Sequence, residues 1–157
     1  MHKRFFSPLL VVLALALAFL AGATFAERTA DPLASDVITR TTATPDEADW
    51  GTFYTYYAGE TYGTMDGLAG VAVIKPGREI HRPHVHAEEE FLMVTEGEGV
   101  WHLNGKEFPA SAGDMLYAAP WDIHGITNTG STPLTFVVWK WNNKGVELPT
   151  QSTDEGH

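Results

Sequence analysis

The residues that decide the fold run from Pro83 to Gly97 and read PHVHAEEEFLMVTEG. On an extended strand the side chains repeat every two residues, so His84 and His86 point to one face, about 6 to 7 Å apart. Glu90 has the same parity, but a straight strand would carry it roughly 13 Å beyond His86. The spacing therefore predicts a turn at residues 87–89 that folds Glu90 back over the two imidazoles on a second strand.

A second stretch supplies one more imidazole. Residues 113–128 read GDMLYAAPWDIHGITN, in which Pro120 begins a turn shortly before His124. A proline-containing turn is a rigid way to present a ligand from a distant strand. Three imidazoles and one carboxylate suit Fe(II), Mn(II), Ni(II) or Zn(II), and an octahedral ion would keep two open positions. We therefore predict a site for one divalent transition metal ion.

These two stretches resemble the two motifs of the cupin superfamily. The pattern H-x-H-x3-E-x6-G runs from His84 to Gly97, and G-x6-P-x3-H-x3-N runs from Gly113 to Asn128. Two departures concern the loops. Gly77 precedes the first histidine with six residues between them where the family has five, and Trp121 and Asp122 stand where a glycine is usual.

The resemblance implies an all-β fold, an antiparallel double-stranded β-helix or jelly-roll barrel, over residues 49–143. It implies metal ligands at His84, His86, Glu90 and His124. Glu88 and Glu89 adjoin the third ligand and offer the same group, but parity and motif position favour Glu90 and leave them as solvated turn residues. A metal-free barrel also fits the family. The resemblance does not assign a reaction, because one barrel serves many chemistries.

Turn signals along the rest of the chain agree with this fold class. Asn104-Gly105 is one of the strongest short hairpin signals. Turns at intervals of 8–12 residues are typical of an antiparallel sandwich or barrel, and no segment has a helical period. In the arm before the barrel, Val37 and Ile38 are candidates for an edge strand. Further strands are expected at residues 50–57, 68–75, 91–94, 100–103, 107–108, 115–118, 125–127 and 134–141.

The first 26 residues are typical of a secretory signal peptide. Lys3 and Arg4 precede an apolar run from Leu9 to Leu20, and small residues end the segment. The alternative is an uncleaved anchor, because residues 5–26 approach membrane-spanning length. We expect cleavage, and hence a periplasmic or secreted protein without stable membrane insertion.

Composition limits the partners. The 157 residues are 44% hydrophobic and 19% charged, as in an ordinary globular domain, and include no cysteine, which excludes a disulfide framework and a thiolate zinc site. Loss of residues 1–26 would leave 8 basic against 20 acidic residues, a formal charge of −12 that argues against binding to nucleic acid. We divide the remainder into an arm (27–48), the barrel (49–143) and a polar tail (144–157).

Three further residues are candidates for binding a small-molecule ligand. Arg78 and Arg82 precede the histidine segment, on the mouth side of the site, and could hold a carboxylate bidentately, although solvated loop arginines fit at least as well. Trp121 could touch a ligand or simply shape the turn in which it lies. His81 has the opposite parity to the ligands and is expected at the pocket rim or on the surface rather than as a ligand. For His102 we expect a structural role.

Three functions fit this sequence. The first is a metal-dependent enzyme for a small polar metabolite, of dioxygenase, isomerase or lyase type, with catalytic residues unknown. The second is a non-catalytic periplasmic protein that binds a small molecule or the metal, and the third is an accessory subunit of a larger complex. The strands carry more aromatic surface than a barrel core needs, so a homodimer is expected. These aromatic residues are Phe53, Tyr54, Tyr56, Tyr57, Trp139 and Trp141.

Overall fold

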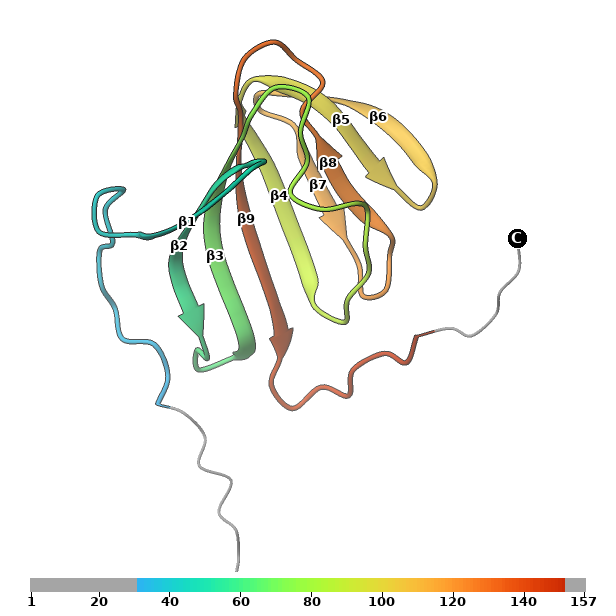
Figure 1. Ribbon diagram of the computed structural model, residues 1–157. Coiled ribbons are helices and arrows are strands. Elements are labelled where there is room, and N and C mark those ends of the chain that lie inside the picture. Colours follow the sequence, from blue (N-terminus) through green and yellow to red (C-terminus); the bar gives the residue numbers. More distant parts are fainter. Residues whose placement is uncertain (1–30, 152–157) are drawn as a thin grey trace, which may run out of the picture.

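A computed structural model describes residues 31–151, which form nine strands in two antiparallel sheets (Figure 1). This confirms the predicted all-β antiparallel barrel, and no helix is assigned in residues 31–151. The six-stranded sheet has the order β1 (Thr44–Ala48), β2 (Gly51–Gly59), β3 (Thr64–Ile74), β9 (Leu134–Asn143), β4 (Glu89–Glu96) and β7 (Met115–Ala118). The three-stranded sheet has the order β6 (Lys106–Ser111), β5 (Glu98–Leu103) and β8 (His124–Thr127).

The core lies between the two sheets and follows the two-residue period of the strands. Phe136 and Val138 of β9 are buried. Phe136 lies opposite Val94 of β4, and Val138 lies opposite Leu92 of β4. Such directly opposed side chains pack face to face, which stabilises the pairing of the two central strands. The three-stranded sheet closes the core with Trp101, Ala110 and Ile126.

The hairpin between β5 and β6 forms at the predicted turn. Asn104 and Gly105 have φ values of 49° and 74°. Both central residues of a type I′ turn need positive φ, which glycine and asparagine adopt at the lowest cost. The turn sets the register in which Leu103 pairs with Lys106.

Two strand boundaries differ from the prediction. The strand expected from residue 68 begins at Thr64, and its pairing with β9 is interrupted next to Asp66, which has a φ of 55°. The edge strand is β1 rather than Val37 and Ile38, and Val37 is 84% exposed. All five residues of β1 are exposed and include Pro45, which an edge strand tolerates, so hydrophobic alternation gave no sign of it.

The outer face of the six-stranded sheet carries aromatic side chains. Phe91 packs between Tyr117 and Trp141, with ring centroids 4.8 and 5.9 Å away, and Trp139 remains exposed. A homodimer that would cover this face stays a prediction.

The predicted signal peptide, residues 1–26, lies outside the described residues. Within residues 31–151 nothing helical is long and apolar enough to cross a membrane.

Candidate metal centre

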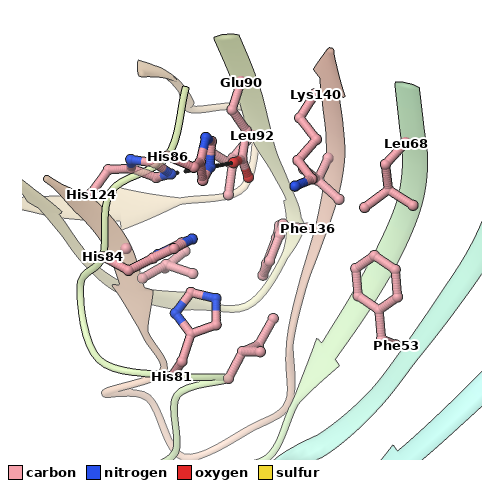
Figure 2. A pocket seen from close by; sticks show the side chains of 14 residues that line it. Phe53, Leu68, His81, His84, His86, Glu90, Leu92, His124, Phe136 and Lys140 are labelled. Carbon is pink, nitrogen blue, oxygen red and sulfur yellow. Dashed lines mark hydrogen bonds and ion pairs between the residues drawn. The ribbon is translucent and has the colours of Figure 1, made fainter. Parts of the chain in front are cut away.

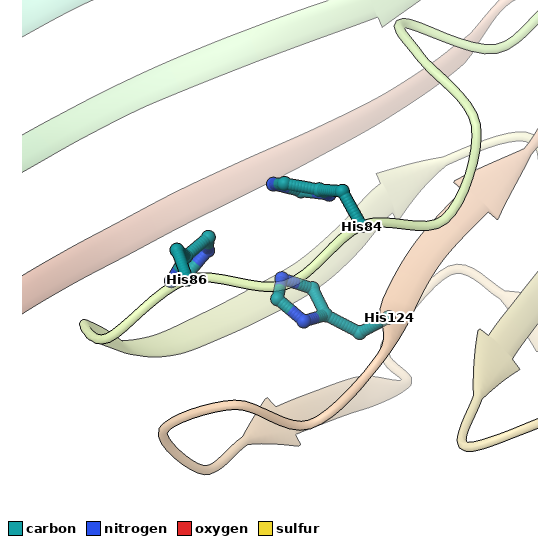
Figure 3. Close-up of side chains that lie close together, drawn as sticks. All are labelled: His84, His86 and His124. Carbon is teal, nitrogen blue, oxygen red and sulfur yellow. The ribbon is translucent and has the colours of Figure 1, made fainter. Parts of the chain in front are cut away.

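Three histidines and one glutamate meet at a cavity between the sheets (Figure 2), and Figure 3 shows the three histidines alone. His84, His86 and His124 each offer a ring nitrogen, and these nitrogens all lie within 4.8 Å of one another. The Oε2 atom of Glu90 lies 2.7 Å from Nε2 of His86 and 3.2 Å from Nε2 of His124. The fold thus brings together the four residues that the sequence predicted as ligands.

Glu90 and His124 reach the site from regular strands. Glu90 is the second residue of β4 and His124 the first residue of β8, and both are buried. His84 lies in the segment between β3 and β4 and forms a single bridge with His124, in which each backbone N–H donates to the other's carbonyl at 3.0 Å. The strand expected at His84 and His86 is therefore one bridge.

Backbone hydrogen bonds fix two of the rings. Nδ1 of His86 donates to the carbonyl of Glu88 at 3.0 Å, and Nδ1 of His124 donates to the carbonyl of Asp122 at 2.8 Å. The other nitrogen, Nε2, faces Glu90. It donates to Glu90 when the ring is protonated, and in the neutral ring it carries a lone pair that can bind an ion. Nδ1 of His84 is buried without a hydrogen-bond partner, a polar group that a bound ion or water would satisfy. The donor set therefore fits a divalent ion.

The electrostatics also suit cation binding. Burial alone would raise the pKa of Glu90, but hydrogen bonds from His124 and His86 outweigh it and lower the pKa to about 2. Burial, together with the neighbouring imidazole of His81, lowers the pKa of His84 to about 4. Burial acts to lower the pKa of His124 too, yet the hydrogen bond to Glu90 prevails and raises it. At neutral pH Glu90 is charged and His84 is neutral, as metal ligands must be.

The cavity beside these residues has a volume of about 160 Å³, below the range usual for drug-sized ligands, so it suits only a compact molecule. His81 lines it next to His84, with ring centroids 4.0 Å apart, and its exposure fits the expected place at the rim. Lys140 enters the cavity from β9. The other walls are apolar and comprise Phe53, Leu68, Ile80, Leu92, Ile126, Phe136 and Val138.

The three predicted ligand-binding residues are not among those that line the cavity. Arg78 and Arg82 are exposed. Trp121 instead shapes the turn, at a φ of 69°: its backbone N–H donates to the carbonyl of His86 at 2.9 Å, and its indole N–H donates to the carbonyl of Pro149 at 2.6 Å. A contact of any of the three with a ligand stays a prediction.

Sequence reasoning missed two charged residues. Glu88, expected to be solvated, is half-buried: its Oε1 lies 3.0 Å from Nζ of Lys140 and its Oε2 lies 3.3 Å from Nδ1 of His86. Burial acts to raise the pKa of Glu88, but the hydrogen bonds from Lys140 and from the backbone of Glu88 itself, with the charge of Lys140, outweigh it and lower the pKa. The signal for Lys140 was its parity, since it shares the inward face of β9 with Phe136 and Val138.

Comparisons with known proteins agree with this geometry. The family model for the cupin domain matches residues 70–140. An oxalate-binding protein from Thermotoga maritima is 38% identical over 64 residues, which are 41% of this chain and 53% of that protein. A gentisate 1,2-dioxygenase from Streptomyces is 28% identical over 61% of this chain and 25% of its own length. The chain thus spans about half, or less, of these two curated relatives.

A solved structure extends the match. The crystal structure of a predicted oxalate decarboxylase from Thermotoga maritima superimposes with a TM-score of 0.56 and 27% identity, over 68% of this chain and 99% of that one. The two sheets, the two histidine motifs and these matches lead to one conclusion: the chain belongs to the cupin superfamily.

Proposed function

We propose that this cupin holds one divalent transition metal ion on His84, His86, Glu90 and His124 and acts on a small carboxylate metabolite in the adjoining cavity. The observation that carries the proposal is the convergence of three ring nitrogens within 4.8 Å, with a carboxylate oxygen 2.7 and 3.2 Å from two of the rings. The small volume of the cavity supports a metabolite-sized ligand.

The relatives support a carboxylate ligand. One is named an oxalate-binding protein, and the crystal structure with 27% identity is described as a predicted oxalate decarboxylase. Oxalate is a compact dicarboxylate, so it is the first compound to test.

The residues at the site have different roles. A bound divalent ion would supply a Lewis acid for ligand oxygens. Glu90 stays ionised at neutral pH, and the carbonyls of Glu88 and Asp122 orient two of the rings. The apolar walls exclude water and strengthen electrostatic interactions inside the cavity.

A polar group inside the cavity distinguishes an enzyme from a simple binding protein. An enzyme needs an acid, base or carboxylate-binding residue within reach of the metal, and both His81 and Lys140 line the cavity. This favours the enzyme. The second candidate is a capture protein, that is, a protein that binds its ligand without catalysis. It is supported by the relative whose name refers to oxalate binding and to no reaction.

Two measurements test the proposal. Protein purified without a metal-binding tag should contain about one divalent ion per chain, and His86→Ala should lose most of it, whereas Glu89→Ala should keep it. The metal-loaded protein is then incubated with oxalate, and both bound oxalate and released CO₂ are measured. Sustained release of CO₂ supports the enzyme, and stoichiometric binding without release supports the capture protein. Full metal content in the His86 variant would contradict the ligand set.

A further inference from the structure

Lys140 occupies a special place in the sheet. In the pairing of β4 with β9 it lies directly opposite Glu90. Residues so opposed have Cβ atoms about 4.5–5.5 Å apart, on the same face of the sheet. Figure 2 shows the Lys140 side chain entering the cavity beside Glu90. A cation therefore stands next to the proposed metal ligands on the inner face of the barrel.

Glu90 does not neutralise this cation. The ion pair that the structure gives Lys140 is with Glu88, at 3.0 Å between Nζ and Oε1. Oε2 of Glu90 is engaged with the rings of His86 and His124. The two carboxylates thus have different partners, and the ammonium group, paired with Glu88, lies beside the proposed metal centre. An ammonium group has three donors, so Lys140 can keep Glu88 and still donate to a ligand.

The surroundings of Lys140 favour an anionic ligand. Among the described residues that line the cavity, it is the only lysine or arginine, and its side chain is 27% exposed. It faces apolar walls that include Leu68 and Phe136. A carboxylate that enters such a cavity loses its water and needs a charged or hydrogen-bonding partner.

We propose that Lys140 determines specificity by pairing with a carboxylate of the ligand, while other donor atoms of the ligand face the metal. The inference rests on the proposed function and narrows its ligand to a small dicarboxylate, or to a carboxylate with a second oxygen donor. Lys140 is a binding residue in this proposal, and Glu88 positions it.

The alternative is a structural role, in which the Lys140–Glu88 pair only ties β9 to the segment that carries His86. The two roles differ in ligand selectivity. A structural ion pair affects stability and metal content and leaves untouched the preference between a dianion and a monoanion of the same shape. Oxalate and oxamate are such a pair, because oxamate has an amide where oxalate has its second carboxylate.

The experiment uses the metal-loaded full chain and measures the dissociation constants of both compounds by calorimetry, with metal content and urea unfolding as controls. Lys140→Met keeps roughly the length of the side chain and removes its charge. It should weaken the binding of oxalate at least tenfold and that of oxamate much less, while the metal content stays full. Lys140→Arg keeps the charge and should retain most of the preference for oxalate.

Glu88→Gln is the second arm. It removes the protein partner of Lys140 and should strengthen the preference for oxalate over oxamate, a result that does not depend on Lys140→Met remaining folded. An unchanged preference in both Lys140→Met and Glu88→Gln, with metal present, would overturn the role of Lys140 and leave the proposed function standing. Failure of the metal-loaded wild-type protein to bind either compound would instead overturn the proposed function, and this inference with it.

Discussion

The two halves of the candidate metal centre are built differently. Glu90 and His124 lie on strands, β4 and β8, and are 6% and 1% exposed. His84 and His86 lie on an irregular segment between β3 and β4, tied to the barrel by backbone hydrogen bonds from His84 to His124 and from Trp121 to His86. Sheet register therefore positions Glu90 and His124, whereas a few local hydrogen bonds position His84 and His86. Substitutions should therefore separate folding from metal binding.

The largest expected effect is that of His124→Ala. It should remove most of the metal and also destabilise the metal-free protein by about 2 kcal/mol or more, because it empties a fully buried position and deprives Glu90 of a hydrogen bond. Metal analysis and urea unfolding after chelation measure the two effects. His84→Ala is the matched control from the irregular segment and should lose the metal at a cost below about 1 kcal/mol, since it removes a ring nitrogen that has no partner. Equal destabilisation by both variants would contradict the division into two halves.

Glu90→Gln tests the carboxylate while keeping its shape. The amide cannot supply an anionic oxygen to the ion, so metal affinity should fall at least tenfold. Substitution of residues that merely hydrogen-bond to metal ligands already lowers metal affinity by about that factor. The control is Glu89→Gln. Glu89 faces outward from the neighbouring position and accepts hydrogen bonds from Tyr117 and Asn143. Metal titration should show a loss of affinity in Glu90→Gln and none in Glu89→Gln. A comparable loss of affinity in Glu89→Gln would contradict the assignment of Glu90 as the ligand.

The two halves should also differ in their response to pH. In the metal-free protein the pKa of His84 is lowered to about 4 and that of His124 is raised. Between pH 6.5 and 4 the unfolded chain protonates His84 first, so its contribution to stability falls as the pH drops. The contribution of His124 has the opposite sign: it is present below pH 6.5 and is lost as the pH rises through its raised pKa.

NMR titration of the imidazoles measures both shifts. His84 should titrate near pH 4 and His124 above 6.5, and His84→Ala should remove part of the acid-side loss of stability. At a pH between the two pKa values, metal uptake should then release a proton from His124 and none from His84, which calorimetry in buffers of different ionisation enthalpy detects. Titration of both rings on the same side of 6.5 would contradict the electrostatic difference between the halves.

The smallest expected effect concerns the hydrogen bond that joins the turn at Trp121 to the C-terminal tail. Trp121→Phe keeps an aromatic ring and the backbone hydrogen bond to His86 but removes the indole donor to Pro149, so the free energy of unfolding should fall by about 1 kcal/mol while the metal is retained. Trp139→Phe, on the exposed outer face, is the control and should change stability little. Thermal unfolding compares the two variants, and full loss of metal in the first would show that the tail contact governs the site.

The sequence predicted the strand-borne half of the site more closely than the loop-borne half. Period-two parity and the motif placed Glu90 correctly on β4, and the turn signal at Asn104 located the hairpin. The strand assumed at His84 and His86 is one bridge, and that bridge keeps His84 beside His124. Lys140 was missed because a charge at the end of an apolar alternation looks like a solvated strand end until the partner strand is known.

The direct opposition of Glu90 and Lys140 limits where this chain can gain or lose residues during evolution. The β4–β9 register is continuous from Glu89 to Val94, and its irregularity comes only after Val94. One residue inserted within that span would turn Glu90 or Lys140 to the outer face, because side chains alternate along a strand. The segment from Gly77 to His84 makes a single bridge at each of Glu79 and His84, so it can absorb a length change. Natural variation in length should therefore gather there, as its one extra residue already suggests, and should be absent between Glu89 and Val94.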